Sequence, residues 1–317
     1  MTTAARRAGA RIIGTGHYQP ARVVTNDELA RLVETNDAWI RQRVGIETRR
    51  YADSESVAEM ATEAARAALG DAGVGAGDVD LVIVATCSNL NRSPSTAGRV
   101  IEALQIDGAT GFDVNSACSG FVHGLETARQ LLAGGAAQTA VVIGAERMTD
   151  ITDFTDRSTC ILIGDAAGAV VLTVAEETTL SPVVWGTAPG LADAVRVEAP
   201  EVTFAQDGRQ VFRWAITEAA NHASKALELA NLAPEDVAAF VPHQANLRII
   251  EPLADQLGLT NAITATDVTE SGNTSAASIP LALSKLLDQH AVPQGAPILL
   301  FGFGGGFSYA ALVVAAP

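Results

Sequence analysis

The chain has few cysteines, and none of them are paired in a metal-binding or redox motif. The three, Cys87, Cys118 and Cys160, are odd in number and widely spaced, with no Cys-x-x-Cys pair. This set argues against a disulfide framework and against a structural zinc site. We therefore expect no metal and a reducing, cytoplasmic compartment, where a thiol stays free.

Basic residues and long apolar runs are also scarce. The 21 Lys and Arg residues against 36 Asp and Glu give a formal net charge of -15, which repels nucleic acid and anionic membranes at long range. No apolar run reaches the roughly 20 residues of a membrane-spanning helix. The basic residues 1–7 lead into the strand-like run 11–14 without the apolar stretch of a secretion signal. We expect neither nucleic acid nor membrane as a partner, and an anionic ligand would need a local basic patch.

What the chain does have is apolar sequence arranged as a repeat. Of 317 residues, 48% are hydrophobic and 18% charged, which allows a large core. Residues 68–74, followed by an apolar run at 81–84, resemble residues 226–232, followed by 238–241, at a spacing of 158 (226 minus 68). Each copy predicts an alanine-rich helix that ends at Gly or Asn and leads to a buried strand. Chance similarity of alanine-rich sequence is the alternative.

A second match closes each half and predicts the fold class. Residues 164–172 resemble residues 304–312, and helices that alternate with apolar strands predict α/β layers around buried sheets. We place the halves at 1–175 and 176–317, packed face to face so that helix N-termini point into a shared cleft. The segment from Glu176 to Asp207, punctuated by Pro and Gly, is expected to connect the halves and is a candidate lid.

Cys118 is the candidate nucleophile. It lies among small residues, 116–120, that allow a sharp turn from a strand ending near Asn115 into a helix predicted over 121–132. A thiol at a helix N-terminus feels the positive end of the helix dipole, so we expect a lowered pKa for Cys118. A small, buried apolar role is the competing interpretation. Cys87 and Cys160 adjoin apolar runs and are expected to lie in or near the core.

His243, Asn273 and the glycine-rich run 302–307 complete the candidate site. His243 ends a buried strand and opens a polar loop, which favours an acid–base or hydrogen-bonding role. Asn273 precedes small residues at a helix start, so its amide could project into a cleft; a plain N-cap is the alternative. The glycine run lacks the spacing of phosphate-binding and dinucleotide-binding motifs. A turn that offers backbone N–H groups to a reacting carbonyl suits it better.

Together these motifs resemble β-ketoacyl-acyl carrier protein synthase III of the thiolase superfamily over nearly the whole chain. The matching segments are residues 13–16, 36–40, 43, 45–46, 116–120, 156–157, 164–168, 211–215, 242–250, 272–278 and 304–307. The resemblance implies a five-layered αβαβα fold of two pseudo-duplicated halves and a homodimer. It also implies an acyltransferase that condenses an acyl-CoA primer, held as a Cys118 thioester, with malonyl-acyl carrier protein, and so initiates fatty acid biosynthesis.

The resemblance further implies a role for each site residue. Cys118, His243 and Asn273 would form the catalytic triad; His243 and Asn273 would bind the malonyl thioester carbonyl and stabilise the enolate, and the N–H groups of Cys118 and Gly305 would form the oxyanion hole. Trp39 and Arg157 would sandwich the adenine of CoA, with core packing as the alternative for Trp39 and Phe212. The rest of the CoA path would be lined by Thr35, Arg43, Gly208, Phe212, Ala215, Asn246 and Arg248, and the carrier protein would meet Arg213 and Arg248. No cofactor is implied, since CoA thioesters and carrier-bound phosphopantetheine are substrates.

Four features depart from the family pattern. Ser119 stands where Ala is common and adds a hydroxyl beside the nucleophile. Ser93 stands where some members place a Phe that closes the partner subunit's acyl pocket, and a smaller residue would admit longer or branched primers. Residues 251–256 lack lysines that some members use to hold the carrier protein, and the stretch between Trp185 and Gly208 is shorter than expected. The primer is therefore left open.

The same positions separate the competing functions. A thiolase would need a second cysteine near the C-terminal glycine run, and residues 301–317 contain none; elongating synthases use two histidines, where this chain has Asn273. A synthase III-like enzyme of polyketide or secondary metabolism, which primes a chain or transfers an acyl group to a hydroxyl or amine, stays open. An inactive partner subunit is disfavoured because the triad is intact.

Overall fold

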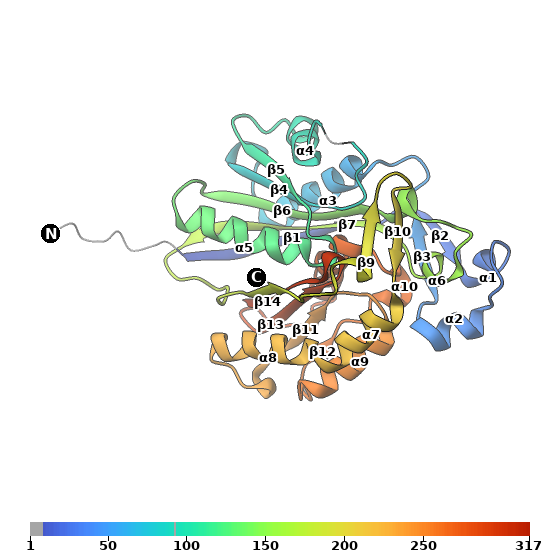
Figure 1. The fold of residues 1–317 in the computed structure, drawn as a ribbon. Coiled ribbons are helices and arrows are strands. Elements are labelled where there is room, and N and C mark those ends of the chain that lie inside the picture. Colours follow the sequence, from blue (N-terminus) through green and yellow to red (C-terminus); the bar gives the residue numbers. More distant parts are fainter. Residues whose placement is uncertain (1–8, 92) are drawn as a thin grey trace.

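Two five-stranded sheets form the frame of the molecule (Figure 1). The computed structural model describes residues 9–91 and 93–317; the basic segment 1–7 lies outside them. The first sheet has the order β1-β7-β6-β4-β5 and the second β12-β11-β13-β14-β8. The first consists of β1 Gly9–Tyr18, β4 Leu81–Ala85, β5 Thr110–Val114, β6 Thr139–Arg147 and β7 Asp165–Ala175, and the second of β8 Val184–Thr187, β11 Ala239–Pro242, β12 Ile263–Thr264, β13 Pro297–Phe303 and β14 Ser308–Ala315.

The two sheets share one topology. In the first, β4 runs parallel to β5 and β6, and β7 is antiparallel to β6 and β1. In the second, β11 runs parallel to β12 and β13, and β14 is antiparallel to β13 and β8. The spacing of the sequence repeat is kept, because β4 begins at Leu81 and β11 at Ala239, 158 residues later (239 minus 81). The two duplicated halves are confirmed; their boundary at residue 175 stays a prediction.

Helices lie between the sheets and outside each of them (Figure 1). The central pair, α5 Gly120–Ala133 and α11 Ser278–Asp288, contacts both sheets. Outside the first sheet lie α3 Val57–Ala72 and α4 Thr96–Leu104, and outside the second α8 Ala219–Ala230 and α9 Leu247–Gln256. As the repeat predicts, α3 and α8 end on left-handed residues, Gly73 (φ 64°) and Asn231 (φ 54°). This is the expected five-layered αβαβα arrangement.

The remaining elements lie to one side and in the connection between the sheets. The side region, at the right of Figure 1, contains β2 Arg22–Thr25, β3 Thr48–Tyr51, α1 Asn26–Leu29, α2 Asp37–Val44 and α6 Arg157–Cys160. The connection carries β8 and a hairpin of β9 Val195–Glu198 and β10 Thr203–Gln206, so it is more ordered than its sequence predicted. It leads into α7 Gly208–Thr217; α10 Val268–Ser271 comes later. Strand β9 packs on the one-turn helix Gly305–Phe307, which places the hairpin beside the glycine run.

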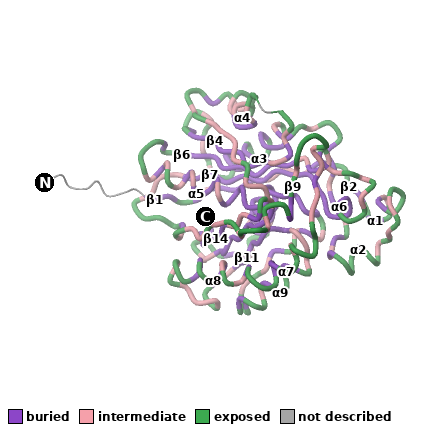
Figure 2. The backbone as a smooth tube through the Cα atoms, in the orientation of Figure 1, coloured by how far each residue is buried: buried purple, intermediate pink, exposed green. Residues whose placement is uncertain are grey.

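The central strands of both sheets are buried on both faces, as the burial colours of Figure 2 show. Every residue of β4 and β11 is buried, which explains their continuous apolar sequence. The halves approach each other through glycines: a Cβ at Gly144 would lie 2.2 Å from the carbonyl oxygen of Ala276, and one at Gly168 would lie 2.4 Å from the backbone nitrogen of Leu281. Within residues 9–91 and 93–317, no helix is long and apolar enough to cross a membrane.

Candidate active site

Cys118 lies in a turn that has a counterpart in the other half. The turn into α5 contains Ala117 with φ 43°, and the turn into α11 contains Ser275 with φ 47°, 158 residues later (275 minus 117). Both residues adopt the left-handed backbone that side chains other than glycine rarely take. By the same spacing, the counterpart of Cys118 is Ala276.

Asn273 matches Asn115, and not Cys118, across the two halves. Each of these asparagines accepts a hydrogen bond from the backbone N–H two residues on, at 3.4 Å from Ala117 and 2.9 Å from Ser275. Asn273 and Cys118 thus lie in corresponding turns of the two halves, but at positions three residues apart (276 minus 273).

The Cys118 thiol is buried, with 6% of the residue exposed. Its Sγ lies 3.6 Å from the Oγ of Ser275, and the N–H of Gly305 also interacts with it. Burial raises the pKa of Cys118 to about 11, because desolvation of the thiolate outweighs the hydroxyl of Ser275 and the N–H of Gly305, which lower it. The predicted lowering of this pKa is therefore wrong for the protein without ligand. Deprotonation of Cys118 needs help from its neighbours or from a bound ligand.

His243 follows β11 and is 2% exposed. Burial lowers its pKa to about 3, so the ring is neutral at physiological pH. Its Nδ1 lies 2.7 Å from the Oγ of Ser278, which accepts a hydrogen bond from the N–H of Gln244 at 3.4 Å. This leaves the Ser278 hydroxyl proton for Nδ1 and favours the tautomer with the proton on Nε2. His243 is thus arranged as a neutral hydrogen-bond donor.

Asn273 is held by its backbone and keeps one side-chain group free. Its N–H donates to the carbonyl of Leu162 at 2.7 Å, and its carbonyl accepts from the N–H of Gly164 at 3.1 Å. Its Oδ1 accepts from Ser275, which is the capping role, but no hydrogen bond in the described part of the chain uses Nδ2. The amide NH2 is available to a ligand carbonyl.

The glycine run after β13 lies directly against Cys118. A Cβ at Gly304 would lie 2.8 Å from the Cys118 Sγ, and one at Gly305 would lie 2.6 Å from the Cβ of Ala117. The hydroxyl of Ser119, next in sequence to Cys118, bonds to groups other than the thiol. Its Oγ lies 2.7 Å from that of Ser308 and donates to the carbonyl of Ser116 at 2.9 Å, so it ties the turn of Cys118 to the end of the glycine run.

Most of the residues expected along the CoA path lie on the outside of the molecule. The guanidinium of Arg157 lies 5.1 Å from the centroid of the Trp39 ring. Trp39 and Phe212 are each 36% exposed, which rules out simple core packing for them. The Oγ1 of Thr35 is buried without a hydrogen-bond partner in the described residues. Of the others, Arg43, Gly208, Arg213 and Arg248 are exposed, Asn246 is half-buried and Ala215 is buried.

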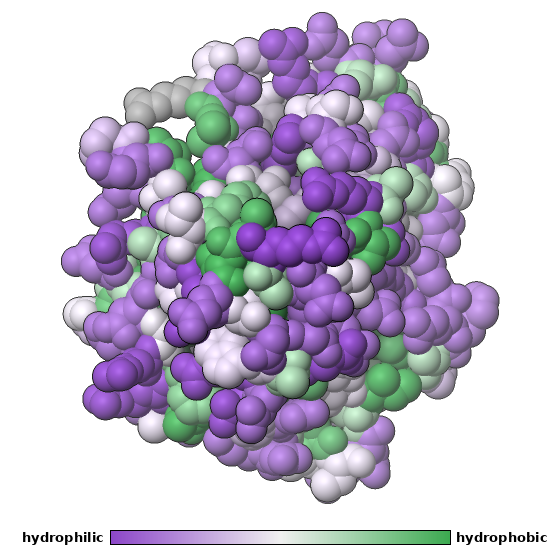
Figure 3. Space-filling model, turned by 90° about the vertical axis from the view of Figure 1, so that its right-hand side faces the viewer, coloured by the Kyte–Doolittle hydropathy of each residue, from purple (hydrophilic) through white to green (hydrophobic). Residues whose placement is uncertain are grey.

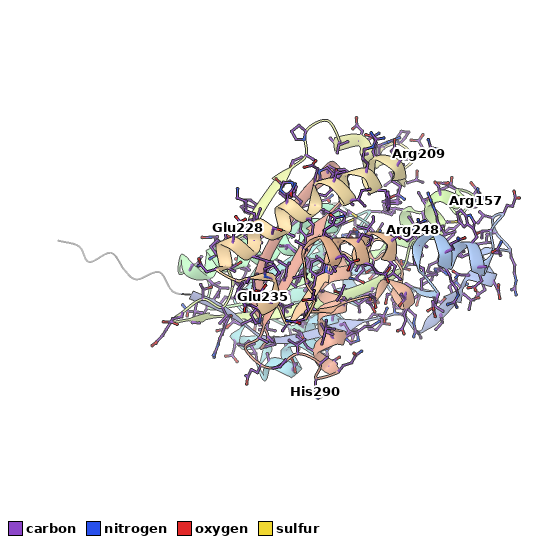
Figure 4. All side chains as sticks on the ribbon, turned by 90° about the horizontal axis from the view of Figure 1, so that it is seen from below. Arg157, Arg209, Glu228, Glu235, Arg248 and His290 are labelled. Carbon is purple, nitrogen blue, oxygen red and sulfur yellow. The ribbon has the colours of Figure 1, made fainter. Side chains whose placement is uncertain are left out.

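These residues come from α2, α6, α7 and α9 and the loops beside them. Figure 3 looks onto the side that carries α1, α2 and α6, where hydrophilic residues cover most of the surface and apolar ones are scattered between them. Figure 4 shows Arg157, Arg209 and Arg248 toward one end of the molecule and Glu228 and Glu235 toward the other. Arg209, at the start of α7, was not predicted as a site residue.

Ser93 shares no cavity with the Cys118 site in the described part of its own chain. It lines a cavity of about 550 Å³ between α3 and α4, together with Thr62, Asn89 and Arg99. Three further residues near Cys118 were not predicted as site residues: Ser275, Cys87 and Glu146. Ser275 lay inside a predicted motif but had no assigned role, and Cys87 was expected in or near the core. The available signal for Glu146 was an acid at the end of the apolar strand β6.

Comparisons with known proteins agree with this geometry. Residues 112–189 match the family model described as 3-oxoacyl-[acyl-carrier-protein (ACP)] synthase III, and residues 227–316 match the model of its C-terminal part. Beta-ketoacyl-[acyl-carrier-protein] synthase III 4 of Streptomyces coelicolor is 52% identical over 98% of this chain and 99% of its own. The mycobacterial beta-ketoacyl-[acyl-carrier-protein] synthase III of Mycobacterium bovis is 42% identical over 100% of this chain and 99% of its own.

Solved structures give the same result. The priming β-ketosynthase of the R1128 polyketide pathway superposes with a TM-score of 0.96 at 39% identity, covering 99% of this chain and 98% of that one. The 3-oxoacyl-[acyl-carrier-protein] synthase III of Aquifex aeolicus superposes with a TM-score of 0.92 at 38% identity, covering 97% and 100%. Fold and similarity thus define a condensing enzyme with the thiolase fold, which is an acyltransferase. The chain belongs to the β-ketoacyl-[acyl-carrier-protein] synthase III family.

Proposed function

We propose that Cys118 accepts the primer acyl group from acyl-CoA. The thiolate attacks the thioester carbonyl, the N–H groups of Cys118 and Gly305 hold the oxyanion, and CoA leaves as a thiol with the proton that Cys118 gave up. The close contact of Gly304 and Gly305 with the Cys118 turn carries this proposal. A side chain at either position would collide with this turn, so only glycines let the backbone approach the sulfur so closely.

In the second half-reaction, His243 and Asn273 hold the carbonyl of malonyl-acyl carrier protein. Loss of carbon dioxide leaves an electron pair that is stabilised as an enolate by the Nε2 proton of His243 and the free amide NH2 of Asn273. The enolate carbon then attacks the acyl thioester, and Cys118 is released as a thiolate that takes up a proton. The neutral ring of His243 supports a donor role over that of a charged acid.

The CoA path is proposed to begin on the outer side with Trp39 and Arg157 at the adenine. The exposed Trp39 ring with Arg157 beside it, the unpartnered hydroxyl of Thr35 and the exposed Arg43 support it, and the 5.1 Å between Arg157 and Trp39 must widen for an adenine to lie between them. Gly208, Phe212, Ala215, Asn246 and Arg248 would line the way inward. Arg213 and Arg248, joined by Arg209, would receive the acidic or phosphorylated carrier; in the described part of the chain none of these three arginines forms an ion pair.

We also propose a homodimer in which Ser93 lines the acyl pocket of the partner subunit and leaves it open to longer primers. The cavity beside Ser93 is lined by none of the residues of the Cys118 site, which supports a role for Ser93 at the acyl chain of a second copy. A Ser93→Phe variant should lose longer primers and keep acetyl-CoA, while sedimentation should give the mass of two chains. The cytoplasm remains the proposed location on the cysteine pattern alone.

A mass-spectrometric assay tests the proposed reaction. We expect a short acyl-CoA to add one acyl mass to the peptide that contains Cys118, and malonyl-acyl carrier protein to discharge it as a 3-oxoacyl product. A panel from acetyl to branched and medium-chain CoA would identify the primer. An unmodified Cys118 with every primer would refute the function.

Priming of a polyketide is the second candidate. The R1128 priming β-ketosynthase is the observation that favours it, with a TM-score of 0.96, and the small Ser93 agrees with a primer larger than acetyl. Fatty acid initiation predicts discharge by the carrier protein of fatty acid synthesis. Discharge only by a polyketide carrier, or transfer to an alcohol or amine, would favour the second candidate.

A further inference from the structure

Ser275 connects the two catalytic residues that come from different halves. Its backbone N–H donates to the Oδ1 of Asn273 at 2.9 Å, and its Oγ lies 3.6 Å from the Sγ of Cys118. Ser275 is 1% exposed and holds the left-handed backbone conformation described above. Its hydroxyl is therefore fixed against the thiol by the same turn that presents Asn273.

Behind Ser275, polar groups continue away from Cys118. The Ser275 Oγ lies 3.5 Å from the Sγ of Cys87, and that thiol lies 3.2 Å from the Oε1 of Glu146. Glu146 is completely buried. Its carboxylate also accepts from the hydroxyl of Thr86 at 3.1 Å, from the N–H of Ser88 at 3.0 Å and from the N–H of Ala276 at 3.3 Å.

These contacts determine which group donates and which accepts along the series from Cys118 to Glu146. Glu146 is surrounded by donors and acts as an acceptor, so the thiol proton of Cys87 is directed to it and the sulfur of Cys87 is left as an acceptor. The Ser275 hydroxyl then has one proton and two sulfur neighbours. While Cys118 is a thiol, it donates to Ser275, and Ser275 donates to Cys87. A thiolate at Cys118 is the stronger acceptor and draws the hydroxyl proton to itself.

We propose that Ser275 is a further catalytic residue, whose hydroxyl donates to the Cys118 thiolate as it forms and turns back to Cys87 once the sulfur carries an acyl group. The proposal rests on the proposed role of Cys118 as nucleophile. Burial opposes ionisation of Cys118, and the Ser275 hydroxyl is the largest influence in the opposite direction. Glu146 and Cys87 are the titratable groups that face this contact, whereas His243 is engaged with Ser278.

Two substitutions should move the ionisation of Cys118 in opposite directions. Ser275→Ala removes the donor, so the pH at which iodoacetamide alkylates Cys118 at half its maximal rate should rise. If this midpoint rises by about one pH unit, alkylation at a fixed lower pH becomes about tenfold slower. Cys87→Ala removes the competing acceptor, so the midpoint should fall. In a protein that already carries Ser275→Ala, Cys87→Ala should leave the midpoint unchanged, because no Ser275 hydroxyl remains to be released from Cys87.

The rate is measured against pH by the mass of the Cys118 peptide, which excludes reaction at other cysteines. Ser275→Ala keeps the Cβ and the N–H to Asn273, and thermal unfolding checks that both variants fold. Ser284→Ala is the matched control: Ser284 is a buried serine of α11 whose hydroxyl lies 2.9 Å from the Nδ1 of His17, and its loss should leave the profile unchanged.

Unchanged profiles in Ser275→Ala, or midpoints that move in the same direction in both variants, would overturn the proposal. The parallel acylation assay keeps the two claims apart. If the unsubstituted protein takes no acyl group from any acyl-CoA, the proposed function fails, and the alkylation profiles still decide whether Ser275 controls the thiol.

Discussion

The turn into α5 and the turn into α11 have matching backbones and carry different chemistry. Each contains an asparagine whose side chain accepts from the N–H two residues on, followed by a residue with left-handed φ. One turn then presents the thiol of Cys118, where the other has the methyl group of Ala276. The duplicated frame thus supplies the turn and its asparagine twice, while the thiol occurs only in the first half.

The ends of the matched strands also carry different residues at equivalent positions. His243 follows β11 at the place where β4 has Ala85, and Gly304 follows β13 at the place where β6 has Glu146; both pairs are 158 residues apart (243 minus 85, 304 minus 146). The second half thus supplies His243, the proposed donor to a ligand carbonyl, and the space beside the sulfur. The first half supplies the sulfur and the buried carboxylate behind it.

Removing the thiol should have the largest effect. Cys118→Ala should lower acyl transfer by roughly 10⁴-fold to 10⁶-fold, as loss of a nucleophile does. Adding Ala276→Cys moves the thiol to the matching place in the other half. We expect no acylation there, because the glycine run lies against Cys118 and not against residue 276. Acyl mass on a peptide with position 276 would show that the turns are interchangeable.

Acidification should destabilise the protein through the buried ring of His243. The matched position in the other half, Ala85, has no titratable group. The unfolded chain takes up a proton near the ordinary histidine pKa of 6.5, whereas the folded one does so only near a pKa of about 3. Stability should therefore fall as pH drops from 6.5 towards 3, by a total on the order of 5 kcal/mol from this residue. Urea unfolding at several pH values should show this loss relative to His243→Gln. A constant difference between the two proteins across that range would contradict it.

The two asparagines give a matched pair of variants. Asn273→Ala should still be acylated but should condense about 100-fold to 1000-fold more slowly, because it loses a donor to the enolate. Asn115→Ala removes the same backbone contact from the other turn and should leave condensation within a few-fold of normal. Acylation and condensation are followed separately by mass and by product release. Loss of acylation in Asn273→Ala would contradict its assignment to the second half-reaction.

The smallest expected effect is that of Ser119, whose counterpart in the turn into α11 is Ala277 (277 minus 119 is again 158). Ser119→Ala removes a hydrogen bond to Ser308 and should cost about 1 kcal/mol in unfolding free energy. It should also slow acylation slightly, since Ser308 contacts the carbonyl of Gly305. Chemical unfolding and acylation time courses measure both. An unchanged free energy of unfolding would show that the Ser119 hydroxyl does not stabilise the contact between the Cys118 turn and Ser308.

The repeat made most of the fold predictable, because periodic helices and continuous apolar strands carry their own signal. The same spacing that linked residues 68 and 226 holds from α3 to the end of β6. The pKa of Cys118 was not predictable, since burial depends on both halves and outweighs the helix end. Nor were the contacts of Ser275, Cys87 and Glu146, which come from segments far apart in sequence. The β9–β10 hairpin lacked a clear pattern because its strands are short and half-exposed.

The glycines between the halves also constrain how the enzyme can move. At Gly144 and Gly168, the main chain of one half lies on the main chain of the other with no side chain between them. Two bodies joined in this way cannot swing apart like hinged domains without losing core packing. Access of a substrate to the buried Cys118 therefore cannot depend on a hinge between the halves. Any gating movement falls to the surface segments, above all the hairpin of β9 and β10 over the glycine run.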